Sequence, residues 1–416
     1  MKRTALTILM LCLVLSGVFA GGNKASGKTT VVFWNGYTGP DRPVLEQIVD
    51  EYNKSQDMVT IQMEIMPWDT LFQKLMPAFI AGNGPDLIAM GATRFPEYAQ
   101  ANRLEALDSR LSGSTKLSAS NLVPGLMGAG VYQGKRYGMP MSFAAMVMYY
   151  NKAMFREVGL DPENPPKTLA ELQAAWDKLI KKDSNGQVSQ YAQAIGVKST
   201  VPMVPVFMWM YGADVLVNGK SALNSPAAAS AFTTLANAYK AGLSPQGLTG
   251  QEADNLFAAG KAAIEFNGPW ALNGFRNAGI DLGVAEVPAG PVARKTWGGD
   301  SMLMINKDSK AKEAAWAFIE YWNSQEVQRK WALEVGFPPT RTDMSQDSAL
   351  LNGNPDIRHF LNSASYAEIF LVGEPKAGRI DEEVLVPLFE SVFRGQVTPQ
   401  AGLADAERKL NALMAE

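Results

Sequence analysis

The chain has 416 residues, enough for two domains, and its 47% hydrophobic and 19% charged residues are typical of a globular protein with substantial cores. Its 38 basic and 41 acidic residues give a formal net charge of −3. No basic block or stripe stands out, which argues against nucleic acid as a partner.

The first twenty residues have the form of a cleavable secretion signal. Lys2 and Arg3 precede an apolar run from Ala5 to Phe19, and Val18-Phe19-Ala20 places small residues at the −3 and −1 positions before Gly21. This run of 15 residues is shorter than the roughly 20 needed to span a bilayer. We therefore expect a signal peptide at residues 1–20, cleaved after Ala20, rather than a retained membrane anchor.

The single cysteine, Cys12, lies inside that apolar run, so the mature chain is predicted to carry no thiol and no disulfide. With His359 as the only histidine, a Cys–His nucleophile pair and a multi-histidine zinc site are excluded. Gly21 and Gly22 stand where a lipid-anchored protein needs a cysteine. We therefore expect a periplasmic or extracellular protein that is not a lipoprotein and holds no metal and no cofactor.

Regular elements begin after a polar spacer, residues 21–28, for which we expect flexibility. Residues 31–34 form an apolar run of strand length, followed by a Gly- and Pro-marked turn. From Pro43 onward, apolar residues recur at helical spacing. Residues 61–65 alternate between apolar and polar, as in a strand.

A second helix is predicted from Asp69, which is expected to cap it, and Pro77 is expected to kink or interrupt it. Gly82-Asn83-Gly84-Pro85 ends this helix, and residues 86–90 form a third, buried strand. The order β-α-β-α-β predicts an α/β fold with a parallel sheet and helices on both faces.

Later segments continue this organisation. Residues 137–150 form a largely apolar stretch, and Thr168 with Glu171 has the spacing of a capping box at a helix start. Further helices are predicted near residues 227–241, 310–323, 326–335 and 402–415.

Short motifs in a fixed order carry a resemblance over nearly the whole mature chain. The set resembles family 1 extracellular solute-binding proteins of ABC importers, the group that includes maltose/oligosaccharide- and glycerol-3-phosphate-binding proteins. Its blocks are Trp68 to Ala81, Gly82-Asn83-Gly84-Pro85-Asp86, Tyr137-Gly138-Met139-Pro140, Tyr149-Tyr150-Asn151-Lys152, Phe155-Arg156-Glu157-Val158-Gly159-Leu160, Pro165-Pro166-Lys167-Thr168, Phe266-Asn267-Gly268-Pro269-Trp270, Trp297-Gly298-Gly299 and Val335-Gly336-Phe337-Pro338-Pro339.

The resemblance implies two lobes, each a mainly parallel sheet flanked by helices, with several crossings of the chain between them. It implies a first lobe of residues 29–142 and 292–345, and a second of 145–290 and 350–416. Hinge strands are expected near residues 142–144 and 287–289. It further implies a monomer that closes around its ligand and docks on the membrane subunits of an ABC permease.

Five aromatic residues are candidates for the ligand site, because sugars offer apolar faces that flat side chains cover. Trp34 ends the first strand and Tyr37 lies in the loop after it, at the sheet edge where ligands bind in open α/β folds, although Trp34 is equally well explained as a core residue. Trp68 begins a helix beside the expected cleft. Trp209 lies in an apolar run and is equally well explained as a core residue. Trp270 follows a turn and matches the position of a stacking aromatic in sugar-binding relatives.

The polar candidates are Thr93, Arg94, Ser142, Gly299 and Asp300. The first two follow the third strand at the spacing where relatives contact ligand hydroxyls, and Ser142 lies at the expected hinge. Gly299 could let the backbone approach a ligand closely. Asp300 could accept two sugar hydroxyls, although an exposed loop carboxylate is the alternative.

Two arginines in later loops, Arg341 and Arg379, complete the candidate set, although most arginines are simply solvated. Arg379, with Ser142 and Gly299, falls where the glycerol-3-phosphate branch contacts its ligand, and an arginine would pair with phosphate. Phe337 departs from that branch, which the resemblance expects to have a tyrosine there.

We therefore predict a substrate-binding component of an ABC importer that binds a di- or oligosaccharide and catalyses no reaction. A glycerol-3-phosphate or glycerophosphodiester ligand is the alternative within the family. A secreted glycoside hydrolase with paired carboxylates, drawn from Glu265, Asp300 and residues 381–383, is the alternative of another class.

Overall fold

The computed structural model describes residues 27–39, 41–198, 203–344 and 346–416, except for the side chain of Asp300. The predicted signal peptide and all but the last two residues of the predicted spacer lie outside this part. No helix among the described residues is long and apolar enough to cross a membrane.

The first sheet is built from the predicted β-α-β-α-β unit. It comprises β1 (Thr29–Asn35), α1 (Arg42–Ser55), β2 (Val59–Ile65), α2 (Trp68–Ala81) and β3 (Leu87–Met90). Strand β1 lies between β2 and β3 and pairs with both in parallel. The parallel sheet predicted from the alternation of apolar runs is confirmed for these three strands.

Helix α2 differs from expectation at two points. Its N-cap is Pro67, and Asp69 lies inside the first turn, where its charge favours the positive end of the helix dipole without capping it. Pro77 lies within the helix and does not interrupt it. Gly82 ends the helix as predicted, with a φ of 73° that glycine adopts without steric cost.

Three further strands extend this sheet on the side of β3. They are β6 (Met139–Ala145), β14 (Thr296–Ile305) and β15 (Ala367–Glu368), in the order β15-β14-β3-β1-β2 with β6 also beside β14. Strand β14 pairs antiparallel with both β3 and β6. The chain leaves this half of the molecule along β6 and returns along β14, which is why the two strands run in opposite directions.

The second sheet has the order β13-β7-β12-β9-β8, with bounds Leu282–Ala285, Val147–Asn151, Ala262–Asn267, Val188–Ala194 and Lys181–Lys182. Only β12 and β9 pair in parallel; β7 is antiparallel to β12 and β13, and β8 to β9. The α/β class is confirmed, but the expectation of a mainly parallel sheet is wrong here. Strand β7 enters from the first half and β13 leads back towards it, so the two are antiparallel.

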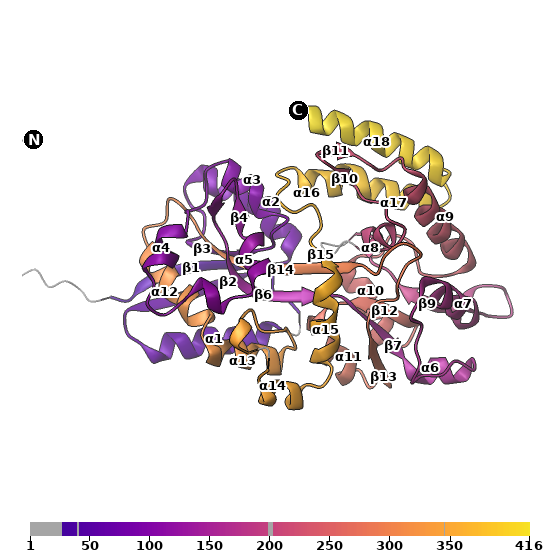
Figure 1. Ribbon diagram of the computed structural model, residues 1–416, viewed down its shortest axis with the longest axis horizontal. Helices are drawn as coiled ribbons and strands as arrows, with labels where there is room; N and C mark the ends of the chain where they lie inside the picture. The colour runs from indigo at the N-terminus through magenta and orange to yellow at the C-terminus, as the bar shows by residue number, and fades with distance from the viewer. Residues whose placement is uncertain (1–26, 40, 199–202, 345) are drawn as a thin grey trace, which may run out of the picture.

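The helices flank these sheets. The first half carries α3 (Phe95–Gln100), α4 (Asp108–Gly113), α5 (Pro124–Ala129), α12 (Lys312–Trp322), α13 (Gln325–Glu334) and α14 (Ser348–Gly353). The second carries α6 (Lys152–Glu157), α7 (Leu169–Leu179), α8 (Met203–Met210), α9 (Pro226–Ala241), α10 (Gly250–Ala258), α11 (Leu272–Asn277), α16 (Ala377–Arg379), α17 (Val386–Phe393) and α18 (Pro399–Ala415). Helix α15 (Ile357–Ser363) lies near the middle (Figure 1).

Local sequence signals explain several helix starts. The capping box predicted at the start of α7 is confirmed: Thr168 Oγ1 accepts from the Glu171 backbone N–H, and the Glu171 carboxylate accepts from that of Thr168. Helices α9, α13 and α18 begin with Ser or Thr caps at Ser225, Ser324 and Thr398. Four short strands, β4 (Val131–Tyr132), β5 (Lys135–Arg136), β10 (Leu216–Val217) and β11 (Lys220–Ser221), form two hairpin pairs.

The buried hydrophobic clusters follow the two sheets. Those around β1–β3 draw their buried members from residues 31–144 and 302–337, and those around β7, β9 and β12 draw theirs from 146–287 and 360–413. Strands β6 and β14 run side by side through the middle (Figure 1). Each half therefore has its own core, although each is assembled from segments far apart in sequence.

Candidate functional site

A cavity of about 480 Å³ lies between the two halves and is lined by residues of both. From the first half, Gly36 and Tyr37 follow β1, and Gly91 to Arg94 follow β3. From the second, Gly196 follows β9, and Asn267 ends β12. Side chains at the carboxyl ends of strands in both sheets therefore meet at one cavity, as is usual for ligand sites in open α/β folds.

Aromatic side chains form much of the cavity wall. Tyr37 contacts Trp68 edge-on with ring centroids 5.6 Å apart, and Trp68 stacks on Phe72 at 6.0 Å. Trp270 reaches from the second half to Trp297 of β14. The aromatic residues that line the cavity are Tyr37, Trp68, Phe72, Phe266, Trp270, Phe275, Trp297, Phe337 and Phe370.

Two glycines make room for the central tryptophans. A β-carbon at Gly268 would overlap the ring of Trp270, and one at Gly299 would overlap the ring of Trp297. The two indoles meet edge-on with centroids 6.1 Å apart. Because neither glycine has a side chain, the Trp270 ring can pack directly on the backbone at Gly268 and the Trp297 ring on the backbone at Gly299. This packing holds both rings at the cavity.

Several predicted polar residues also meet at the cavity. The Tyr37 hydroxyl lies 3.0 Å from Ser142 Oγ, and Thr93 Oγ1 donates to the Phe370 carbonyl at 2.7 Å. The Arg94 guanidinium lies over the Phe72 ring, 4.8 Å from its centroid, and 3.5 Å from Glu382. Because Phe370 and Glu382 belong to the second half, Thr93 and Arg94 connect the two halves across the cavity.

The charged groups lining the cavity are mostly acidic: the four carboxyls are Asp41, Asp254, Glu265 and Asp381, and the guanidinium of Arg94 is the one cation among the described lining residues. Burial raises the pKa of Asp41 and of Asp381 to about 6, against 3.8. Burial raises the pKa of Glu265 well above its usual value, and the Asp254 charge adds to this. The cavity is therefore suited to a ligand that donates hydrogen bonds rather than to an anion.

Of the predicted site residues, Tyr37, Trp68, Thr93, Arg94, Ser142, Trp270 and Gly299 line the cavity. Trp34 does not: its half-buried ring packs against the core between α2 and the first sheet, so β1 directs it away from the cavity edge. Trp209 is 8% exposed in α8, within the core of the second half. The alternation of side chains along β1 and the apolar surroundings of α8 account for these placements. The side chain of Asp300 lies outside the described part of the chain.

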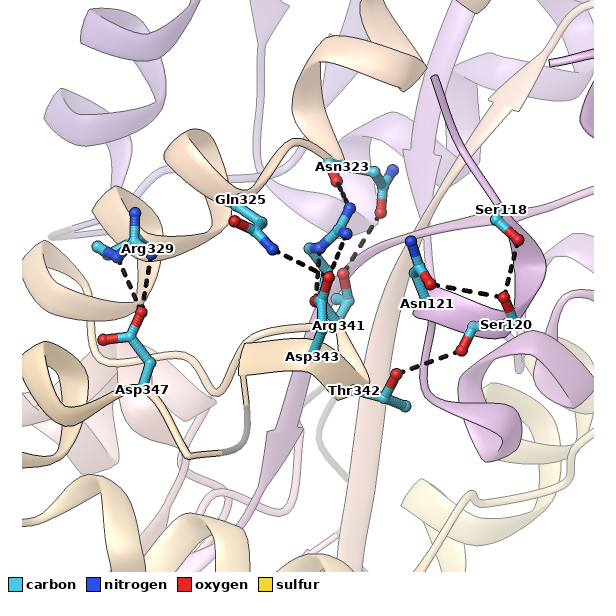
Figure 2. A network of polar contacts seen from close by, with 11 residues as sticks. Ser118, Ser120, Asn121, Asn323, Gln325, Arg329, Arg341, Thr342, Asp343 and Asp347 are labelled. Atoms are coloured by element: carbon cyan, nitrogen blue, oxygen red, sulfur yellow. Dashed lines mark hydrogen bonds and ion pairs between the residues drawn. The ribbon is translucent and has the colours of Figure 1, made fainter. Parts of the chain in front are cut away.

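Neither Arg341 nor Arg379 lines the cavity. Arg341 is 7% exposed, binds the Asp343 carboxylate through Nε (2.9 Å) and Nη2 (2.6 Å), and donates to the Asn323 carbonyl at 2.7 Å (Figure 2). Arg379 is exposed and pairs with Glu383 and Glu416. Both guanidiniums are therefore occupied by partners of the protein itself, away from the cavity.

Other cavity residues were not among the sequence-based candidates. Trp297 and Phe337 belong to two of the motifs on which the resemblance rests, so these motifs could have identified both as candidates for the ligand site. Phe72 lies one helical turn after Trp68, a spacing that places both on the same face of α2. Asp254 gave no local signal, because it lies in an otherwise ordinary amphipathic helix. Glu265 and Asp381 also line the cavity, and the sequence named them only as candidate carboxylates of the hydrolase alternative. Among the described residues, no group of three or more His, Cys, Asp or Glu side chains could hold a metal ion.

The raised pKa of Asp381 predicts a pH-dependent stability. The unfolded chain releases this proton near pH 3.8 and the folded chain near pH 6. As the pH rises from 4 to 6, the free energy of unfolding should therefore fall, by up to about 3 kcal/mol for this group, and then level off. Asp381→Asn should remove this part of the fall and raise stability at pH 8.

Urea unfolding at pH 4 and pH 8 measures this effect. The control is Asp308→Asn, which changes an exposed carboxyl that is not among the cavity residues. An equal fall in the wild type and in Asp381→Asn would show that Asp381 does not titrate as its burial predicts.

The family model described as bacterial extracellular solute-binding protein matches residues 47–358. A binding protein of Brucella abortus (strain 2308), whose name states no ligand, is 28% identical over 98% of this chain and 97% of its own length. A maltotriose-binding protein of Pyrococcus abyssi is 26% identical, over 85% of this chain and 75% of its own. A periplasmic sn-glycerol-3-phosphate-binding protein of Rhizobium meliloti is 24% identical, over 94% and 95%.

Solved structures show the same fold. An ABC transporter solute-binding protein of Thermotoga lettingae, bound with alpha-D-tagatose, superposes with a TM-score of 0.83 at 25% identity, covering 93% of this chain and all of that one. An ABC substrate-binding protein of Listeria monocytogenes, in complex with cycloalternan, has a TM-score of 0.84 at 23% identity, covering 93% and 99%.

Proposed function

This chain belongs to the bacterial extracellular solute-binding proteins, and on that premise we propose that it captures a carbohydrate for an ABC importer. The ligand is a di- or oligosaccharide, held in the cavity between the two sheets and handed to the membrane subunits of a permease. A relative named for maltotriose and a solved relative bound with tagatose support this ligand class.

The observation that carries the proposal is the composition of the cavity wall. Trp68, Trp270 and Trp297 offer flat apolar surfaces, while Asp254 and Asp381 offer acceptors for hydroxyl groups. A sugar needs both, because it has apolar C–H faces and a rim of hydroxyls. The volume of about 480 Å³ is in the range of small-ligand sites.

Glycerol-3-phosphate is the second candidate, supported by the Rhizobium meliloti relative. Arg94 is the residue that could pair with a phosphate, but it already faces Glu382 at 3.5 Å. Four carboxyls also line the cavity, and those that are ionised would repel a dianion in a site of reduced dielectric. Arg379, the arginine expected to serve this ligand, is occupied by two glutamates. These charges favour the sugar.

We assign residues 29–142 and 292–345 to the first lobe and 145–290 and 350–416 to the second, a division supported by the two sets of buried clusters. Within the last segment, α14 packs on the first half and β15 pairs with β14 of the first sheet, so these two elements depart from the division. The hinge strands are the segments at 142–144 and 287–289. The lobes close by bending there, which brings Trp270 against Trp297 and Phe337. The protein acts as a monomer, exported by a signal peptide cleaved after Ala20 and not anchored by lipid.

The proposed function is binding without chemistry. A glycosidase keeps its two carboxyls about 5 Å or more apart, on either side of the bond it cleaves. Here Asp254 Oδ1 and Glu265 Oε1 both accept from the side-chain amide of Asn267, which holds the two carboxyls side by side rather than on either side of a glycosidic bond. Incubation with oligosaccharides should release no product; turnover would overturn this part of the proposal.

A thermal-shift screen tests the ligand class directly. Maltotriose, mannobiose, tagatose and glycerol-3-phosphate are added in turn, because a ligand that binds only the folded state raises Tm. We expect a rise of Tm with at least one sugar and none with glycerol-3-phosphate. A rise with glycerol-3-phosphate alone would replace the sugar by the second candidate.

A further inference from the structure

Two carboxyl groups on one wall of the cavity share a single amide. Asn267 Nδ2 donates to Asp254 Oδ1 at 2.8 Å and to Glu265 Oε1 at 3.0 Å. The amide cannot be turned around, because its oxygen accepts the backbone N–H of Gly268 at 2.8 Å. Both hydrogens of this amide are therefore used by carboxyls, one from α10 and one from β12.

This pair has no cation to offset its charge. Glu265 is 1% exposed and Asp254 is half-buried. No ion pair within 4.0 Å in the described part of the chain includes either carboxyl. Glu265 Oε2 is buried and receives no hydrogen bond from a donor there. Two carboxylates held by one amide in a buried site repel each other when both are charged, and this repulsion favours a state in which the pair keeps one proton.

Within the described residues, the groups around the pair supply no second donor. On β7, Tyr149 lies opposite Glu265 in the register, but its hydroxyl donates to the Gly268 carbonyl at 2.8 Å. On β9, the register partner of Glu265 is Ala194, which has no titratable group. Further away, Arg276 and Asp356 form their own ion pair.

We propose that Asp254 and Glu265 share one proton, and that the pair presents the Asp254 carboxylate to a hydroxyl group of the ligand while refusing a phosphate. Glu265 is the positioning residue: its acidic O–H donates to Asp254 and turns the remaining lone pairs of Asp254 towards the cavity. Asp254 contacts the ligand. The ligand half of this proposal rests on the proposed function, and the proton half does not.

Carbon-13 NMR of the carboxyl groups tests the shared proton in the ligand-free protein. In the wild type, the Glu265 carboxyl should keep the chemical shift of a protonated acid at pH 7. In Asp254→Asn, where the neighbouring charge is gone, Glu265 should release its proton at a lower pH. Two ionised carboxyls at pH 7, or an unchanged Glu265 titration in Asp254→Asn, would overturn the proposal.

Binding of maltotriose as a function of pH tests the role of the pair. Wild-type affinity should fall when Glu265 loses its proton, because the donor to Asp254 is lost and the second charge repels the first. Glu265→Gln keeps a donor without a titratable charge, so its affinity for maltotriose should not vary with pH across that range. Glu265→Leu, of similar volume, should bind maltotriose at least 10-fold more weakly than the wild type. The control is Glu334→Gln, which changes an exposed glutamate that is not among the cavity residues and should match the wild type.

Glycerol-3-phosphate is the second probe. The double variant Asp254→Asn, Glu265→Gln should bind it at least 10-fold more tightly than the wild type, because the charge that repels phosphate is gone. An equal pH dependence of maltotriose affinity in wild type and Glu265→Gln would overturn the positioning role. If maltotriose does not bind the wild type, the sugar class fails instead, while the NMR titration still decides whether the proton is shared.

Discussion

Trp270→Ala is expected to weaken sugar binding by about 100-fold, or about 3 kcal/mol, which is the range of a central aromatic anchor. The Trp270 ring lies over Gly268, contacts Trp297 and lies 6.0 Å from Phe337 across the cavity. Truncation therefore removes a flat surface for the ligand and a contact between the two halves. Calorimetric titration with the best sugar from the thermal-shift screen measures the loss.

Trp34→Ala is the matched control for this change. Trp34 is also a half-buried tryptophan, but it packs against the core beside α2 rather than at the cavity. Trp34→Ala should lower Tm of the ligand-free protein and leave sugar affinity unchanged. Trp270→Ala should weaken sugar binding and leave Tm of the ligand-free protein nearly unchanged. If Trp270→Ala instead greatly lowers the stability of the ligand-free protein and preserves sugar affinity, Trp270 is a core residue rather than a ligand-binding residue.

Arg341→Ala is expected to destabilise the protein by about 3 kcal/mol, as is typical when one partner of a buried, charge-assisted network is removed. The guanidinium makes a two-point contact with Asp343 and satisfies the Asn323 carbonyl, which joins the end of α12 to the segment after α13 (Figure 2). Asp343, whose pKa is held low by Arg341, would lose that partner. Urea unfolding at pH 7 measures the change.

Two variants separate geometry from charge at this position. Arg341→Lys keeps the charge but cannot make the two-point contact, so we expect an intermediate loss of stability. Arg379→Ala removes an arginine from an exposed pair with glutamates and should change stability little. Under conditions where each variant is folded, sugar affinity should match the wild type. A lower sugar affinity in Arg341→Lys or Arg379→Ala would indicate that the arginine concerned contributes to ligand binding.

Local sequence patterns predicted those features of the fold that depend on residues close together in the chain. The apolar runs and Gly-Pro turns of residues 31–90 predicted the β-α-β-α-β unit, and Thr168 with Glu171 predicted a real capping box. Both are local features, determined by residues within a few positions of one another. The motif that ends in Trp270 also predicted a cavity residue correctly, because the turn after β12 places its residues at the edge of the sheet.

The sequence by itself thus determined the α/β class, the three parallel strands β1 to β3 of the first sheet and seven candidate residues that line the cavity. Only the tertiary structure decided that Arg341 and Arg379 are occupied elsewhere, because their partners are set by packing. It also decided that β7 runs against its neighbours, which follows from the chain crossing between two cores. Above all, it placed Asp254 beside Glu265: ionisable groups interact through space, and spacing along the chain does not report which carboxyls share one buried site.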